Sequence, residues 1–191
     1  AQPGYHSTGR SAALFAESYG TAKVRALTMA SRTFLESPPQ GFAEHPLLTP
    51  RGALLVATQG QEALLQQTWQ TLRTISDRIQ LLGPSQACAM VPVLRRERVV
   101  GAVYDPGAAD IDVNALHQGY LRGLRQQGGR VVCDAEVTTL SRADGCWRVR
   151  AGGCDYTAPT VLNAAGACAD RIAQLAGVAP IGLQPRRRSV F

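Results

Sequence analysis

The chain has 191 residues, of which 45% are apolar and 18% are charged, and its formal net charge is +6. This length corresponds to one domain or to two small lobes, and the apolar fraction excludes a disordered chain. The sequence contains no run of about 18 apolar residues, which excludes a transmembrane helix.

The first half of the chain predicts three helices and three strands. Apolar residues at helical spacing indicate helices over residues 11–35 and 61–76. The turn Gly83-Pro84-Ser85 places Ser85 as the N-cap of a short helix over residues 86–90. Short apolar runs bounded by turn residues predict strands over residues 52–58, 79–82 and 99–104.

The second half predicts a helix, a small antiparallel sheet and a final helix. Asp112 is the expected N-cap of a helix that runs to about Gln127. The pairs Asp144-Gly145 and Gly152-Gly153 are typical of the turns in a three-stranded meander. A last helix is expected over residues 167–175. The predicted strands cover residues 130–133, 137–142, 146–151, 155–157 and 159–163, and residues 183–191 form an extended segment. The fold class is therefore α/β, with mixed α and β elements.

Arginine supplies almost all of the positive charge, because Lys23 is the only lysine among 20 basic residues. This bias indicates either an anionic ligand, which guanidinium groups bind well, or a general compositional bias that also explains the abundant alanine. The arginines are scattered, apart from Arg95-Arg96 and the run at residues 186–188. Nucleic-acid binding proteins concentrate such charge, so we expect no nucleic-acid partner.

The five cysteines are Cys88, Cys133, Cys146, Cys154 and Cys168, and no two of them form a C-x-x-C pair. This odd number and spacing fit neither a disulfide framework nor a zinc site. The start of the chain has no basic region followed by an apolar stretch, as a signal peptide would have. We expect reduced thiols in a cytoplasmic protein without a structural metal.

The most informative segment lies between the predicted strand 159–163 and the predicted helix 167–175. Small residues stand at this junction, namely Ala164, Ala165 and Gly166. Small side chains let a ligand approach the backbone, and a helix N-terminus attracts phosphate through its N–H groups. The alternative is close packing of the helix on the strand.

A second candidate anion site precedes the first predicted helix. It consists of five consecutive residues, Ser7, Thr8, Gly9, Arg10 and Ser11. Hydroxyl, guanidinium and backbone N–H groups at this position can hold an anion. The alternative is that Ser7 or Thr8 is simply the N-cap of the long helix.

Four segments resemble the FAD-dependent oxidoreductases of the D-amino acid oxidase type, a group that includes glycine oxidase, sarcosine oxidase and D-amino acid dehydrogenases. The segments are GYHSTGRSAALFAESYG, YDPGAADIDVNALHQGYLRGLRQQGGRV, VLNAAGACAD and LQPRRRSVF. They occur in the family's order and cover nearly the whole chain. Cys168 stands where the family often has tryptophan.

The resemblance implies a partial Rossmann-like FAD-binding lobe and a substrate lobe built on a mixed sheet. The FAD-binding lobe would include residues 1–42 and 113–182. The substrate lobe would include residues 43–112, and residues 183–191 would begin a return to it. The family's N-terminal G-x-G-x-x-G strand is missing here, so we expect the chain to correspond to the middle of such an enzyme. We expect the full-length protein to bind FAD, and residues 1–191 alone to bind it weakly or not at all and to be inactive.

The resemblance also implies FAD as the cofactor and an amine or amino acid as the substrate. Hydride would pass from the substrate carbon to the flavin, and no catalytic side chain is assigned. Arg51 and Tyr104 are candidates to bind a substrate carboxylate, and self-association into a homo-oligomer is possible. The residues expected to contact FAD are Ser7, Thr8, Gly9, Arg10, Ser11, Val137, Ala164, Ala165 and Gly166. The alternative to an enzyme is an α/β module that binds a phosphorylated small molecule or a protein.

Overall fold

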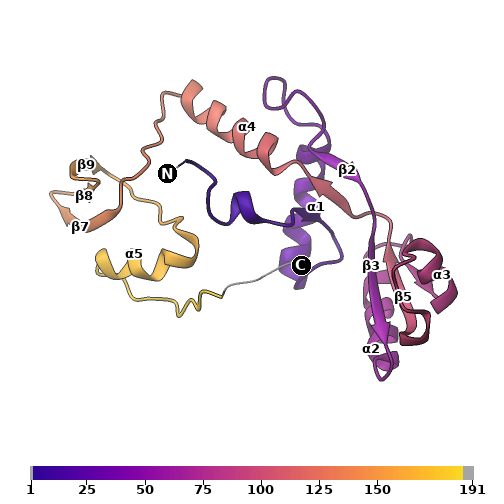
Figure 1. The fold of residues 1–191 in the computed structure, drawn as a ribbon. Helices are drawn as coiled ribbons and strands as arrows, with labels where there is room; N and C mark the ends of the chain where they lie inside the picture. The colour runs from indigo at the N-terminus through magenta and orange to yellow at the C-terminus, as the bar shows by residue number, and fades with distance from the viewer. Residues whose placement is uncertain (1, 187–191) are drawn as a thin grey trace. The chain divides into compact units, whose positions relative to one another are not determined.

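The structure is a computed structural model that describes residues 2–186, and the chain divides into two compact units. Unit 1 comprises residues 1–5 and 130–191, and unit 2 comprises residues 6–129 (Figure 1). Helices and antiparallel sheets are interspersed along the chain. This composition confirms the predicted combination of α and β elements.

Unit 2 contains four α-helices and two sheets of three strands each. The helices are α1 (Ala22–Glu36), α2 (Glu62–Arg73), α3 (Pro84–Met90) and α4 (Val113–Gln126), with the 3₁₀ helices η1 (Thr8–Arg10) and η2 (Arg96–Arg98). The strands are β1 (Leu14–Phe15), β2 (Leu48–Pro50), β3 (Ala53–Thr58), β4 (Gln80–Leu82), β5 (Val99–Asp105) and β6 (Ala109–Ile111). All six strands pair antiparallel.

The sheet β3-β5-β4 has a helix on each face (Figure 1). Leu65 and Leu72 of α2 pack with Val103 on one face. Ala87 of α3 packs with Ala102 on the other face. Because Ala102 and Val103 are adjacent in β5 and point to opposite faces, this strand is buried on both sides. The predicted strands 52–58, 79–82 and 99–104 are confirmed, as is the helix predicted over residues 61–76.

The second sheet, β1-β6-β2, joins the long helices α1 and α4 into one core. Phe15, Leu35, Leu47 and Ala109 are its buried apolar residues, and Leu116 of α4 packs against them. The strand β2 leads directly into β3, and the N–H groups of residues 51 and 52 both donate to the Ala108 carbonyl. This connection ties the two sheets of unit 2 together.

Two predicted N-caps have different outcomes. Asp112 is the N-cap of α4, since its Oδ1 accepts a hydrogen bond of 2.8 Å from the N–H of Ala115. The prediction that Ser85 caps the next helix is wrong, because α3 begins at Pro84 and its N-cap is Gly83. The Gln86 side chain accepts from the Gly83 N–H at 2.9 Å, and proline suits the first helical position because it has no N–H to satisfy.

The predicted helix over residues 11–35 is wrong in its first half. Helix α1 begins at Ala22, and Thr21 is its N-cap. Leu14 and Phe15 instead form β1, which pairs with β6 almost 100 residues later. Ala13 and Gly20, on either side of this stretch, have φ angles of +45° and +87°, which a right-handed helix does not allow.

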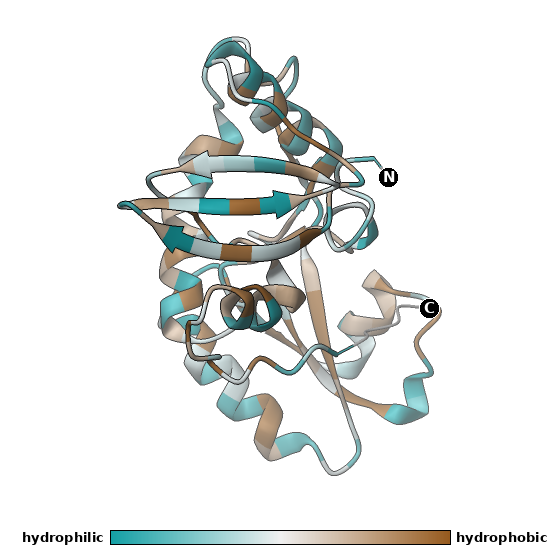
Figure 2. Ribbon diagram, turned by 90° about the vertical axis from the view of Figure 1, so that its left-hand side faces the viewer, coloured by the Kyte–Doolittle hydropathy of each residue, from teal (hydrophilic) through white to brown (hydrophobic). Residues whose placement is uncertain are grey.

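Unit 1 contains a three-stranded meander and one α-helix. The strands are β7 (Val137–Ala143), β8 (Cys146–Ala151) and β9 (Cys154–Ala158), followed by η3 (Gly166–Cys168) and α5 (Ala169–Leu175). The three strands, the turns at Asp144-Gly145 and Gly152-Gly153, and the last helix are confirmed. Figure 2 shows polar and apolar residues alternating along the central strand of this sheet, β8, as expected for a sheet with one covered face.

Two further strand predictions, over residues 130–133 and 159–163, are wrong. Neither segment forms a helix or strand, and Leu162 is 89% exposed. A strand needs a neighbour for its backbone hydrogen bonds, and nothing in residues 2–186 pairs with either segment. Residues 183–186 also lie outside regular structure, and the rest of the predicted segment 183–191 falls outside the described residues. None of the helices described is long and apolar enough to cross a membrane.

Candidate cofactor site

The first candidate segment, Ser7 to Ser11, forms the exposed 3₁₀ helix η1 and the residues on either side of it. Ser7 precedes η1 but its side chain makes no capping hydrogen bond. The Ser11 hydroxyl donates to the Thr8 carbonyl at 3.0 Å. Because ten residues separate this segment from α1, neither Ser7 nor Thr8 is the N-cap of the long helix. The segment remains a candidate to contact an anionic group.

The second candidate segment, Ala164 to Gly166, is an exposed loop in front of η3 and α5. Gly166 has a φ of +55°, and a Cβ added to it would meet no atom within 4 Å. The small residues therefore do not serve close packing against any described element. That the loop binds a ligand through its backbone stays a prediction.

Asn163 shapes this loop, and the sequence alone did not single it out. Its side-chain amide donates to the Ala169 carbonyl at 2.8 Å, and its Oδ1 accepts from the Ala165 N–H at 3.3 Å. An asparagine that bonds the backbone two residues later is a known turn device, which was the available signal.

Asp170 holds the chain that follows α5. Its carboxylate accepts three backbone hydrogen bonds, from the N–H groups of Ile181 at 3.1 Å, Gly182 at 2.9 Å and Leu183 at 2.7 Å. The two polar residues of the segment VLNAAGACAD, Asn163 and Asp170, thus both bond to the main chain. Asn163 fixes the backbone beside the small residues, and Asp170 fixes residues 181–183.

Val137 begins β7 and is half-buried. It pairs with Ala151 at a point where the register shifts, before the regular ladder starts at Thr139. Such an irregularity frees part of the backbone from the ladder. Helix α5, which follows the Ala164–Gly166 loop in the chain, contacts β7, and both lie in unit 1. Residues 7–11 belong to unit 2.

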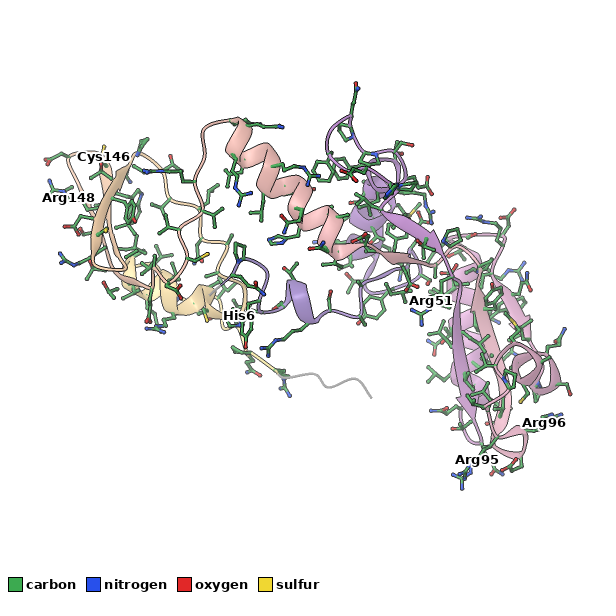
Figure 3. All side chains as sticks on the ribbon, turned by 45° about the horizontal axis from the view of Figure 1, so that its top comes forward. His6, Arg51, Arg95, Arg96, Cys146 and Arg148 are labelled. Carbon is green, nitrogen blue, oxygen red and sulfur yellow. The ribbon has the colours of Figure 1, made fainter. Side chains whose placement is uncertain are left out.

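Arg51 and Tyr104, the candidates for a substrate carboxylate, come together at Gly52 in unit 2. A Cβ on Gly52 would lie 2.6 Å from the Tyr104 hydroxyl oxygen, so the Tyr104 side chain covers the backbone beside Arg51. The Arg51 Nη1 is 2.8 Å from Oδ1 of Asp110, and both side chains are at least half exposed. Figure 3 shows Arg51 at one end of the β3-β5-β4 sheet and Arg95 and Arg96 at the other.

The best-connected polar group in unit 2 is Arg32, which the sequence analysis missed. Its guanidinium bonds to Glu17, Glu36 and the Gly107 carbonyl. The hydrogen bond that Arg32 donates to Glu17 is the largest of the effects that raise the pKa of Arg32 above its ordinary value. The spacing of Arg32 and Glu36, four residues apart on a helix, was the only local signal.

An open groove of about 310 Å³ runs beside β1 and α1. It is mainly apolar, and its walls include Leu14, Phe15, Tyr19 and Leu27. The groove begins three residues after Ser11, so it is the apolar surface next along the chain from the first candidate segment. Among residues 2–186 no cluster of His, Cys, Asp or Glu could hold a metal ion.

Comparison with solved structures finds the same fold in flavoenzymes. Glycine oxidase from Geobacillus kaustophilus matches with a TM-score of 0.74 and 23% identity, over 87% of this chain and 47% of that one. L-alpha-glycerophosphate oxidase from Mycoplasma pneumoniae, solved with FAD bound, matches with a TM-score of 0.73 and 20% identity, over 89% and 47%. This chain therefore spans about half the length of each.

Comparison by sequence gives a relative and a family. Human mitochondrial dimethylglycine dehydrogenase is 31% identical over 99 residues, which are 51% of this chain and 11% of that protein. The family model described as "FAD dependent oxidoreductase" matches residues 1–191. Its match runs the whole length of the chain, and so this protein belongs to the family of FAD-dependent oxidoreductases of the D-amino acid oxidase type.

Proposed function

We propose that this chain is part of an enzyme that oxidises a carbon–nitrogen bond of an amino acid or a secondary or tertiary amine, with FAD as the electron acceptor. The observation that carries the proposal is the family match over residues 1–191. Two similar proteins, dimethylglycine dehydrogenase and glycine oxidase, are named for substrates with such a bond. The binding-module alternative lacks any comparable support.

Each exposed segment, taken by itself, offers groups that suit one part of a dinucleotide. Ser7 to Ser11 offer hydroxyl, guanidinium and N–H donors, which suit phosphate oxygens. In the Ala164–Gly166 loop, a Cβ added to Gly166 would meet no atom within 4 Å, so a ligand could approach the backbone there. We assign Val137 to the adenine, because it stands at the start of β7, where the register with β8 shifts. Bound FAD would supply the hydride acceptor that no protein side chain provides.

Arg51 and Tyr104 would orient the substrate. Arg51 already pairs with Asp110, so a substrate carboxylate would either replace Asp110 or bind the Arg51 guanidinium together with it. The Tyr104 hydroxyl lies beside the Gly52 backbone and could donate to the same carboxylate. We expect the Arg51→Gln variant to raise KM for an amino acid several-fold while leaving kcat nearly unchanged, because it removes binding common to ground and transition states.

The first test of the function is cofactor binding by the purified natural polypeptide that carries residues 1–191. Melting temperature is followed with FAD, FMN, AMP and inorganic phosphate in separate samples. A ligand that binds the folded state raises the melting temperature according to its affinity. FAD should stabilise most and AMP less. Stabilisation by phosphate alone, equal to that by FAD, would favour the binding module.

The second test is turnover. Glycine, N-methylglycine and N,N-dimethylglycine are added without oxygen to the FAD-loaded natural polypeptide that carries residues 1–191, and the flavin absorbance near ~450 nm is followed. Glycerol 3-phosphate is the matched control, since it carries a C–O bond in place of C–N. Bleaching by an amine supports the proposal, and bleaching by glycerol 3-phosphate alone contradicts it.

A further inference from the structure

We propose that Arg32 is a positioning residue for the cofactor: it fixes β1 to the β5–β6 turn and so holds the preceding residues, Ser7 to Ser11, where FAD would contact them. This inference rests on the proposed function, since it assigns a role in binding FAD. It concerns a side chain that is itself outside both candidate cofactor segments.

Each of the three nitrogens of the Arg32 guanidinium donates a hydrogen bond. Nε donates to Glu17 Oε1 at 2.7 Å, and Nη1 donates to Glu36 Oε1 at 2.8 Å. Nη2 donates to the Gly107 carbonyl at 3.2 Å, and the group lies 4.7 Å from the centre of the Phe15 ring. One planar group therefore joins α1, the segment around β1 and the β5–β6 turn.

A second set of bonds joins the same two segments. The Ser18 hydroxyl donates to Asp105 Oδ2 at 2.6 Å, and Asp105 Oδ1 accepts from the Gly107 N–H at 2.9 Å. Asp105 is only 5% exposed, so this carboxylate is satisfied by protein groups rather than by water. The Ile111 N–H also donates to the Ala13 carbonyl at 2.8 Å.

These bonds fix residues 13–18 on both sides of β1. Ser11 is separated from β1 by two residues, so a displacement of β1 moves the first candidate segment with it. The groove beside β1 would change as well, because Phe15 is one of its walls and is also the ring under Arg32. Arg32 is thus coupled to the expected cofactor contacts through β1, which directly follows them in the chain.

The identity of the residue matters because guanidinium offers several donors in one fixed plane. Lysine at this position keeps the charge but presents a single ammonium group. It could bond to one or two of the three acceptors, and it would not lie flat on Phe15. We therefore expect Arg32→Lys to recover only part of the function that Arg32→Gln loses.

The experiment compares Arg32→Gln and Arg32→Lys with Arg73→Gln. Arg73 is the matched control, because it lies 4.8 Å from the ring centre of Trp69 on α2 and takes no part in the contacts around β1. Amide hydrogen exchange of the protein without FAD is measured over residues 12–18 and 105–111. We expect faster exchange in both segments of Arg32→Gln, and wild-type rates there in Arg73→Gln.

Cofactor affinity is then measured by the quenching of FAD fluorescence. The Kd for FAD should rise about tenfold or more in Arg32→Gln, less in Arg32→Lys, and less than twofold in Arg73→Gln. The rise in melting temperature that FAD produces should shrink in the same order. A purely structural role would lower the melting temperature with and without FAD equally, leaving that rise unchanged.

The two arms separate the possible failures. Wild-type exchange rates in Arg32→Gln, or an unchanged Kd despite faster exchange, would overturn the proposal. If the wild-type protein itself does not bind FAD, the proposed function fails, and the cofactor half of this inference fails with it. The exchange arm contains no FAD, so it still decides whether Arg32 fixes β1.

Discussion

At the scale of single residues, two carboxylates order the backbone around them. Asp170 accepts three N–H groups in succession, and Asp105 accepts one from a buried position. Hydrogen bonds to a charged acceptor are stronger than those between neutral groups. Removing the charge at such a position therefore affects the fold more than removing an exposed ion pair.

This difference can be measured within unit 1. We expect Asp170→Asn to lower the free energy of unfolding by about 1–3 kcal/mol, because an amide offers one acceptor oxygen to three donors. Asp155→Asn is the control, since Asp155 only pairs with Arg150 at 3.4 Å on the surface, and its cost should stay below about 0.5 kcal/mol. Urea unfolding monitored by Trp147 fluorescence gives both values. Equal costs would show that the backbone contacts of Asp170 contribute nothing.

Gly52 provides a second residue-scale prediction. It has a φ of +79°, and a Cβ there would lie 2.7 Å from a ring carbon of Tyr104. We expect Gly52→Ala to cost about 2–4 kcal/mol, from backbone strain and overpacking together. Gly60 has a similar φ of +85° but open space around its Cβ position, so Gly60→Ala should cost only about 1 kcal/mol. Unfolding in urea, followed by Trp69 fluorescence, distinguishes them, and similar costs would contradict the proposed clash.

At the scale of elements, the sequence correctly predicted the turns and helix caps that depend on local interactions. The turn at Asp144-Gly145 places φ angles of +53° and +78° where a tight hairpin needs them, so its residues alone indicate the meander. Asp112 likewise forms its capping bond three residues away. These features depend on neighbours within a few residues, which is why pattern analysis found them.

The elements that pattern analysis missed depend on distant partners. Strand β1 exists because residues 109–110 pair with it, and the sequence of residues 11–20 does not indicate that partner. Residues 130–133 and 159–163 have the composition of strands but no partner in the described structure. The site divides in the same way. The small residues at 164–166 could be found from the sequence, whereas the contacts of Arg32 with Gly107 join residues 75 positions apart.

At the scale of the whole molecule, the two compact units differ in the size of their cores. In the described part of unit 1 the buried apolar residues are Leu140 and Ala151, whereas all the others belong to unit 2. Hydrophobic burial is the main favourable term in stability. Unit 2 should therefore withstand more denaturant than unit 1.

The two tryptophans allow this to be tested directly. Trp69 lies in α2 of unit 2 and Trp147 in β8 of unit 1, and the chain contains no other tryptophan. In Trp69→Phe the remaining tryptophan, Trp147, reports the unfolding of unit 1, and in Trp147→Phe the remaining Trp69 reports that of unit 2. We expect the urea midpoint of Trp69→Phe to be the lower of the two. Far-UV circular dichroism of each variant is the control for the substitution itself. Coincident midpoints would mean that the units unfold as one.

The tip of the β7–β8 hairpin has a practical consequence. The Asp144 side chain is 92% exposed, and no atom lies within 4 Å of a Cβ added to Gly145. Exposed loop tips of this kind accept inserted sequence, because the inserted chain displaces no packed group. A short epitope or a fluorescent peptide spliced between Asp144 and Gly145 would make the protein visible or capturable without touching the segments assigned to cofactor and substrate.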